Sequence, residues 1–190
     1  MRKASVPVLL LSFVLLAVAS IPAEAQGPRT VSTRLRGFDE VPAVATRAGG
    51  RFSATIDEDE NEIEYTLRYR LLEGAVTQAH IHLGQDDVNG GIMVFLCSNL
   101  GNGPAGTQAC PAGNSATEAV VTGTITASDV IAVAAQGVAA GEFFTLERAI
   151  RAGIAYVNVH STLFPGGEIR GQLDLRGGGQ QDLQEDLLEE

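Results

Sequence analysis

Apolar and polar residues alternate along most of the chain after about residue 30. In the clearest run, Glu62–Leu72, the apolar side is made of Ile63, Tyr65, Leu67, Tyr69 and Leu71. The residues between them are charged or carry a hydroxyl group. A period of two is typical of a β-strand with one buried face and one face in water. This stretch therefore predicts a half-buried antiparallel strand.

Seven more stretches of strand type are separated by turn residues. They are Val31–Gly37, Gly49–Asp57, Thr77–Leu83, Gly91–Cys97, Thr117–Thr126, Ile154–His160 and Glu168–Leu175. Two pieces predict helix instead. Ser128-Asp129 is expected to cap a short turn that runs to Val133. Gly141–Arg151 places apolar residues at helical spacing, and Gly153 suits the end of that helix.

This pattern predicts an all-β fold with minor α content. We expect an antiparallel, immunoglobulin-like β-sandwich or flattened barrel with one or two short helices.

The N-terminal segment, residues 1–25, has the order of a secretory signal peptide. Arg2 and Lys3 precede an apolar run, and Ala23-Glu24-Ala25 supplies a small-x-small cleavage pattern. A membrane anchor is the alternative, because the run is close to the length that spans a bilayer. The cleavage pattern favours removal. We therefore expect one domain over residues 26–176, no membrane span after it, and a disordered Gly/Gln-rich acidic tail over 177–190.

Charge narrows the range of partners. The chain has a formal net charge of −10, with 13 Lys and Arg against 23 Asp and Glu. This balance argues against nucleic acid and against anionic membranes, whose phosphates need clustered basic residues. The expected partner is an unknown extracellular or envelope protein or ligand.

Cys97 and Cys110 are the two cysteines of the chain. In an exported protein such a pair indicates one disulfide that closes a loop. A cysteine-based metal site is the weaker alternative, because the sequence has no CxxC spacing.

Three stretches together resemble the CHRD (chordin) domain family. They are Leu35-x-Gly37-x-x-Glu40-Val41-Pro42, then Ala79-His80-Ile81-His82-x-Gly84 with Gly90-Gly91, then Ala155–Ser161 with Pro165-x-Gly167-Glu168-Ile169-Arg170-Gly171-Gln172-Leu173. The resemblance implies a secreted or periplasmic immunoglobulin-like β-sandwich. The cysteine-rich growth-factor-binding repeats of chordin are absent from the sequence, so that activity does not carry over.

The three histidines of the chain, His80, His82 and His160, all fall inside these stretches. Strand alternation puts His80 and His82 on one face, and His160 shares a face with Tyr156 and Asn158. If the two strands are neighbours, the imidazoles meet and form a site for copper or zinc. The alternative is that they hydrogen-bond to backbone or to carboxylates and fix the strand register. Suggested partners are Glu168, Arg170 and the turn at Asp86-Asp87.

Four further residues of the same stretches are expected to be structural. Glu168 and Arg170 share a polar strand face, where they are expected to form a pair of modest strength or, for Arg170, to contact an anion. Glu40 is expected to be a buried partner of an arginine or of a histidine. Asn158 is the fourth of these residues with an expected structural role.

No catalytic motif stands out, and we expect that the protein is not an enzyme. The sequence predicts a secreted or periplasmic binding or structural module of unknown ligand. The alternative is an extracytoplasmic copper- or zinc-binding protein that uses a three-histidine surface site. No cofactor is firmly expected beyond that possible metal.

Overall fold

The computed structural model describes residues 28–113 and 117–175. It contains eight strands, β1(Arg29–Arg36), β2(Gly49–Asp57), β3(Glu62–Arg70), β4(Val76–Leu83), β5(Gly91–Ser98), β6(Ala119–Ile125), β7(Ala155–Ser161) and β8(Ile169–Leu173). The helical elements are α1(Phe143–Arg151) and three short 3₁₀ turns, at Gly37–Asp39, Ala127–Asp129 and Ala134–Gln136.

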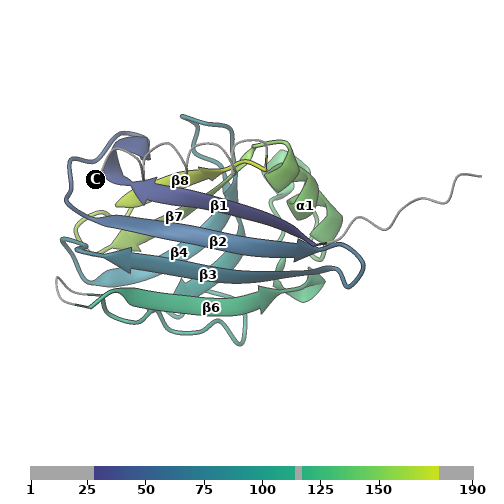
Figure 1. Cartoon of the computed structure of the whole chain (residues 1–190), viewed down its shortest axis with the longest axis horizontal. Helices are drawn as coiled ribbons and strands as arrows, with labels where there is room; N and C mark the ends of the chain where they lie inside the picture. Colours follow the sequence, from purple (N-terminus) through teal and green to yellow (C-terminus); the bar gives the residue numbers. More distant parts are fainter. Residues whose placement is uncertain (1–27, 114–116, 176–190) are drawn as a thin grey trace, which may run out of the picture.

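All eight strands belong to one antiparallel sheet with the order β5-β4-β7-β8-β1-β2-β3-β6. The sheet curls so that β1, β2, β3 and β6 form the front layer and β4, β7 and β8 lie behind them (Figure 1). The two layers are joined where Arg36 of β1 pairs with Arg170 of β8. A flattened barrel therefore describes the fold better than two separate sheets. The predicted all-β class with minor helix is confirmed.

The inward-facing residues of both layers form the core between them. Ile81, Val157 and Ile169 from the back layer are each 0% exposed, as are Phe52, Ile63 and Leu67 from the front layer. The alternation in Glu62–Leu72 is confirmed up to Arg70, where β3 ends. Leu71 leaves the strand because its backbone adopts a φ of 58°, so the expected continuation to Leu72 is wrong.

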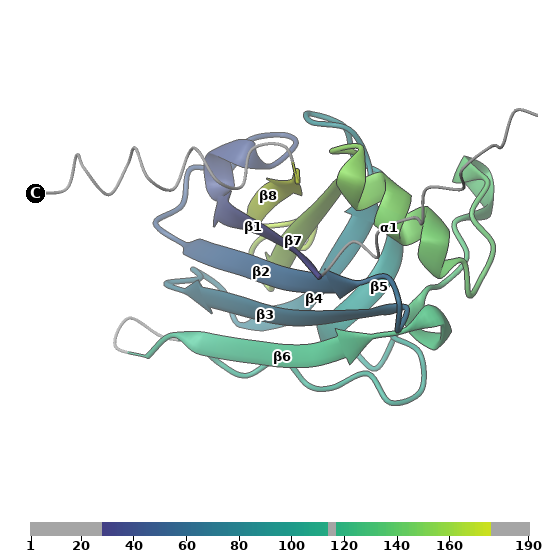
Figure 2. The ribbon, with the colours of Figure 1, turned by 45° about the vertical axis from the view of Figure 1, so that its right-hand side comes forward.

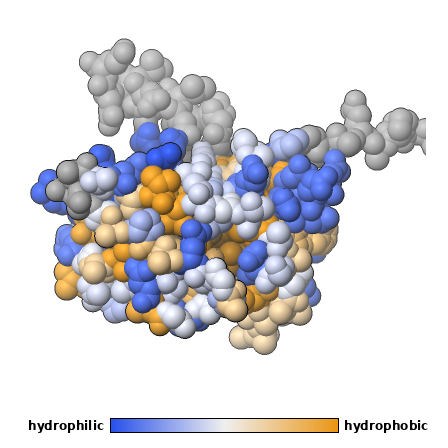
Figure 3. Space-filling view, turned by 90° about the horizontal axis from the view of Figure 1, so that it is seen from below, coloured by the Kyte–Doolittle hydropathy of each residue, from blue (hydrophilic) through white to orange (hydrophobic). Residues whose placement is uncertain are grey.

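The two edge strands, β5 and β6, are brought together by side chains and a loop. The Tyr65 hydroxyl donates to the Leu96 carbonyl at 3.1 Å, and the Gln108 amide donates to Tyr65 Oη and to the Thr122 carbonyl. The predicted disulfide Cys97–Cys110 is present and holds the loop that carries Gln108. Figure 3 shows that this lower side of the molecule mixes apolar and polar side chains.

Helix α1 lies at one end of the barrel beside β7 (Figure 2). It confirms the helix expected within Gly141–Arg151, and it buries Phe143, Leu146 and Ile150. The helix ends where Gly153, with a φ of 70°, donates to the Ile150 carbonyl and Ile154 donates to the Ala149 carbonyl. This pair of bonds is the usual glycine-terminated helix end.

The other predicted helical turn needs a correction. Its cap is Thr126 and not Ser128-Asp129, because the Asp129 carboxylate accepts the Thr126 backbone N–H at 2.8 Å. The turn covers Ala127–Asp129 and does not continue to Val133. The predicted signal peptide, residues 1–25, and the predicted tail, residues 177–190, lie outside the described residues. No helix in the described ranges is long and apolar enough to cross a membrane.

Candidate metal centre

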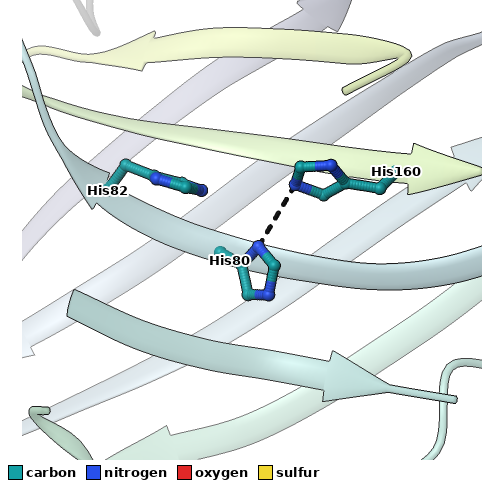
Figure 4. A group of neighbouring side chains, drawn as sticks. All are labelled: His80, His82 and His160. Atoms are coloured by element: carbon teal, nitrogen blue, oxygen red, sulfur yellow. Dashed lines mark hydrogen bonds between the residues drawn. The ribbon is translucent and has the colours of Figure 1, made fainter. Parts of the chain in front are cut away.

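The histidine cluster, defined as His80, His82 and His160, lies on the outer face of the back layer. Strands β4 and β7 are neighbours, with His80 opposite Asn158 and His82 opposite Tyr156. One ring nitrogen from each histidine lies within 4.8 Å of the other two. His80 Nδ1 and His160 Nε2 are 3.2 Å apart, and the three rings point toward one another (Figure 4). The convergence that a shared metal ion requires is therefore present.

The cluster is buried and not on the surface, which corrects the sequence prediction. His80, His82 and His160 are 0%, 7% and 6% exposed. The outer face of β7 is covered as completely as its inner face, and every residue of this strand is buried. Connecting segments supply the cover, since His82 and His160 contact the carbonyls of Gly90 and Pro165. Period-two alternation shows which residues share a face, but it does not show whether a loop lies over that face.

Hydrogen bonds to backbone fix the tautomers of two of the rings. His82 Nδ1 lies 2.9 Å from the Gly90 carbonyl, and His160 Nδ1 lies 3.0 Å from the Pro165 carbonyl. A carbonyl oxygen only accepts, so each Nδ1 carries the proton and each Nε2 presents a lone pair. Metal-binding histidines usually donate their second ring N–H in this way. His82 Nε2 is buried and has no hydrogen-bond partner, as is also true of His80 Nε2.

Burial also keeps the rings neutral. Desolvation, with smaller contributions from His160 and His82, lowers the pKa of His80 to about 2. Desolvation likewise lowers the pKa of His82 to about 4, although its bond to the Gly90 carbonyl acts in the opposite direction. The pKa of His160 is lowered for the same reason. Neutral imidazole is the form that binds transition metals.

Asn158 places a further oxygen beside the cluster. Its Oδ1 lies 3.0 Å from His160 Nε2. The buried Glu40 carboxylate is hydrogen-bonded by Asn158, which indicates that the amide N–H groups face Glu40 and that Oδ1 faces the histidines. Oδ1 and the deprotonated Nε2 are then two acceptors in contact. His80 Nδ1, 3.2 Å from the same Nε2, then donates its proton to it, and a cation shared by Oδ1 and Nε2 would take the place of that proton.

Glu40 itself is 5% exposed, and its Oε1 has no hydrogen-bond partner. Burial raises the pKa of Glu40 to about 7, against the opposing effects of Arg170, the Val41 backbone and Asn158. A side chain at Gly167, where φ is 131°, would collide with this carboxylate. Glu40 is thus buried, Arg170 is among the charged groups that act on it, and Asn158 is its neighbour beside the histidine cluster.

A stack of three side chains supports His82. The rings of His82 and Tyr156 are parallel within 5°, with 4.7 Å between their centroids. The Arg170 guanidinium lies 3.5 Å from the centroid of the Tyr156 ring. Since β4 and β8 flank β7 on opposite sides, His82 and Arg170 contact opposite faces of Tyr156. The stack fixes the plane of the His82 ring.

Arg170 and Glu168 do not form the pair that the sequence suggested. Arg170 donates to the Gln85 and Val88 carbonyls at 3.0 and 3.1 Å and to Asn89 Oδ1 at 3.4 Å, so it holds the loop that covers the cluster. Glu168 Oε1 accepts from Thr46 Oγ1 at 2.9 Å and from the Glu73 backbone at 2.8 Å. The two side chains therefore secure different connecting segments. Both are buried, at 1% and 0% exposure, and not on a wet polar face.

Hydrogen bonds from the histidines to backbone, one of the alternatives expected from the sequence, are present, but the partner residues differ from those suggested. Their partners are Gly90, Pro165, Asn158 and one another, in place of Glu168, Arg170 or the Asp86-Asp87 turn. Tyr156, Gly90 and Pro165 also belong to the site, although they were not among the site residues predicted from the sequence. Tyr156 could have been found, because it shares a strand face with Asn158 and His160. The two carbonyl contacts depend on loop paths that no side-chain pattern encodes.

The fold and the histidine cluster together define an antiparallel β-domain with a buried centre of three imidazoles. The family model of the CHRD domain matches residues 31–173. The chain belongs to the CHRD domain family, which confirms the resemblance seen in its motifs. A search of curated proteins and a search of solved structures gave no match. The family and the disulfide are consistent with an extracellular or periplasmic location.

Proposed function

We propose that this chain is an exported, non-catalytic binding module whose ligand is a copper or zinc ion held by the histidine cluster. The observation that carries the proposal is the convergence of three ring nitrogens within 4.8 Å. Two of these rings have their other nitrogen on a backbone carbonyl, as histidine ligands of metals usually do.

The spacing suits an ion with little rearrangement. Ligand nitrogens about 2.0–2.1 Å from a tetrahedral ion lie roughly 3.3 Å from one another. His80 Nδ1 and His160 Nε2 already lie 3.2 Å apart, so mainly His82 would need to move inward. Its Nε2 has no hydrogen-bond partner that such a movement would break.

The donor set favours copper or zinc over the hard cations. Imidazole nitrogen suits zinc and copper, whereas calcium and magnesium prefer carboxylate, carbonyl and water oxygens. Asn158 Oδ1, 3.0 Å from His160 Nε2, is placed to be the fourth ligand. Asn158 would in turn be oriented by the Glu40 carboxylate. Three imidazole nitrogens and one amide oxygen are all neutral ligands, so they do not neutralise the positive charge of the ion. The Glu40 carboxylate lies next to these ligands and would offset that charge.

Binding at a buried site implies that its cover opens. The segments around Gly90 and Pro165 hold His82 and His160 through backbone carbonyls. The binding of an ion and the orientation of these two rings therefore depend on the same loops. A bound ion would therefore stabilise these loops as well as the strands. This property fits a module that stores or delivers the ion, or one that uses it for structural stability.

X-ray absorption spectroscopy of the zinc-loaded and copper-loaded protein tests the proposal. The chain has three histidines, so any imidazole scattering must come from this cluster. We expect three nitrogen ligands at about 2.0–2.1 Å with imidazole multiple scattering. A first shell made only of oxygen, with no imidazole signal, would refute the proposal.

A further inference from the structure

Two connecting segments meet over the histidine cluster. The first is the loop between β4 and β5, which is tied to the cluster by the hydrogen bond from His82 to the Gly90 carbonyl. The second is the segment that follows β1, which brings the buried Glu40 carboxylate beside the cluster. The exposed side-chain amide of Asn89, on the loop, donates to the Val41 carbonyl of the second segment at 2.8 Å. The two segments therefore meet at the protein surface, in a junction that a side-chain hydrogen bond closes.

Three exposed carboxylates lie at this junction, and we call Asp39, Asp86 and Asp87 the acidic rim. Asp86 and Asp87 belong to the loop, and Asp39 belongs to the second segment. Partial burial raises the pKa of Asp39, and the charges of Asp86 and Asp87 act in the same direction. Arg36 and Arg170 act in the opposite direction and offset part of the negative charge. These mutual effects indicate that the carboxylates of the two segments lie near one another.

Acceptor groups continue inward from the acidic rim to the histidines. Glu40 follows Asp39 in the chain, is 5% exposed, and has an Oε1 without a hydrogen-bond partner. Next to Glu40, Asn158 Oδ1 lies 3.0 Å from His160 Nε2. His82 Nε2 is buried and likewise has no partner. Carboxylate, amide and imidazole groups all bind cations, so their order from the surface to the cluster suits the passage of a positive ion.

Other sides of the cluster are closely packed in the part of the chain that the structure describes. Toward β5, the Phe95 ring meets the His80 ring edge to face, with 4.5 Å between centroids. The Tyr156 ring covers one face of His82. On the side of the segment after β7, Gly167 lies so close to Glu40 that a side chain there would collide with the carboxylate. The junction at the acidic rim is therefore the side on which acceptor groups reach the surface.

We infer that a metal ion enters the histidine cluster through this junction, and that the acidic rim attracts the ion from solution and raises its rate of binding. The inference rests on the proposed binding of copper or zinc by the cluster. Charged groups at the mouth of a site raise the association rate of an oppositely charged ligand by about 10- to 1,000-fold. Charges at the rim of a site change association more than dissociation. The acidic rim thus determines the rate of binding and is not part of the ligand set.

Stopped-flow kinetics of zinc binding to the full chain test this inference. Metal-stripped protein is mixed with zinc in the range where the observed rate rises in proportion to zinc, and dissociation is measured with excess chelator. We expect Asp86→Asn/Asp87→Asn to lower the association rate constant by about threefold or more at about 0.1 M salt. The dissociation rate constant should change less than about twofold. Asparagine keeps the size of both side chains and tolerates the φ of 59° at Asp87.

Glu62→Gln/Glu64→Gln is the matched control, because it removes two exposed carboxylates from the outer face of β3, in the opposite layer. It makes the same change in net charge and should change the association rate constant by less than about 1.5-fold. At about 1 M salt, where the Debye length is about 3 Å, the rim variant should come within about twofold of the wild type. Circular dichroism shows whether each variant is folded, and Asp39→Asn replaces the rim variant if the latter fails to fold.

Three results would overturn the entry path while the metal site stands. These are an association rate constant that the rim variant shares with the wild type, equal losses in the rim and control variants, and a loss in the rim variant that is as large at 1 M salt as at 0.1 M salt. A wild-type chain that takes up no zinc at equilibrium would instead refute the proposed function, and the entry path with it.

Discussion

The ring of His82 lies flat on the ring of Tyr156, with 4.7 Å between centroids and 5° between planes. The same tyrosine ring carries the Arg170 guanidinium on its other side, at 3.5 Å. A histidine that belongs to the candidate metal centre is thereby oriented by an aromatic residue, and that residue is held by a buried arginine. The geometry of the centre depends on this stack as well as on its ligands.

Removing the stacking ring should weaken metal binding. Tyr156→Leu deletes the aromatic face against His82, and we expect about tenfold lower zinc affinity in competition with a chelator, as is typical for residues that orient a ligand. Tyr156→Phe keeps the ring and loses only the acceptor for the Gly90 N–H, so its affinity should fall less than about threefold. Tyr69→Leu is the matched control, because Tyr69 is a buried tyrosine whose hydroxyl contacts Pro111 instead. Equal losses of affinity in Tyr156→Leu and Tyr69→Leu would contradict the orienting role.

Arg170 should be important for stability, because it is a buried cation held by loop carbonyls and by the Tyr156 ring. Arg170→Lys replaces a planar fork with a single ammonium group, which cannot reproduce both the stack and the bonds to the Gln85 and Val88 carbonyls. We expect the free energy of unfolding in urea to fall by about 2–4 kcal/mol. Hydrogen exchange in residues 85–90 should also become faster. Arg148→Lys is the control, because Arg148 is exposed, and it should change the free energy of unfolding by less than about 0.5 kcal/mol. A loss below that value for Arg170→Lys would contradict the proposed role in holding the loop.

The disulfide should contribute to stability without affecting the metal centre. Cys97 and Cys110 are 13 positions apart, and a loop of this size is stabilised by about 3 kcal/mol in the chain-entropy model. The variant Cys97→Ser/Cys110→Ser should lose about that amount in chemical denaturation. Its zinc affinity should be unchanged, because the bridge holds the loop at the seam between β5 and β6. A parallel loss of zinc affinity, at a temperature where the variant is still folded, would show that the two regions are coupled.

Acid should destabilise the fold through the histidine cluster. The folded-state pKa of His82 is about 4 and that of His80 about 2, both below the value of 6.5 in an unfolded chain. The contribution of these two histidines to the free energy of unfolding is complete above about pH 6.5. It is lost as the pH falls toward their folded-state pKa values, because the unfolded chain then takes up more protons than the folded one. The pKa of His160 is lowered as well and acts in the same direction.

Glu40 acts in the opposite direction. Burial raises the pKa of Glu40 from 4.5 to about 7. Its contribution to the free energy of unfolding is therefore complete below about pH 4.5 and is lost as the pH rises through 7. Arg170, Asp39 and Asn158 are the groups that face it. The effect of the three histidines is larger than that of the one carboxylate. We therefore expect the free energy of unfolding, measured by urea denaturation, to fall by a net amount on the order of 2 kcal/mol between pH 7 and pH 5. Glu40→Gln should make this loss larger. Stability that is constant over this range in both proteins would contradict the burial of neutral histidines.

Sequence patterns predicted the strands of this fold well, because the core requires a period of two. Ile63, Leu67, Ile81 and Val157 all point inward as their alternation indicated. Alternation also identified the face that His80, His82 and His160 share. It could not reveal that this face is covered, since the cover comes from connecting segments and not from a strand or a helix. For that reason Glu168 and Arg170, which look like exposed strand positions, are buried anchors for those segments.

The ring contacts of the cluster lie beyond sequence patterns for a second reason. The Gly90 and Pro165 carbonyls fix the two tautomers through backbone atoms, which every residue possesses. The Asn158–Glu40 contact joins residues 118 positions apart, and only the β7 strand and the loop after β1 bring them together. Side-chain identity shows which groups are available, whereas the loop paths determine which of them meet.

Metal content after equilibrium dialysis is the most direct test of the histidine cluster as a metal centre. Metal-stripped protein would be dialysed against micromolar zinc or copper, and bound metal would be counted per chain by mass spectrometry. We predict about one equivalent per chain, and a loss of most of it in His160→Gln. Less than about a tenth of an equivalent of either metal would contradict the account, because three neutral imidazoles placed around one point should hold an ion at that concentration.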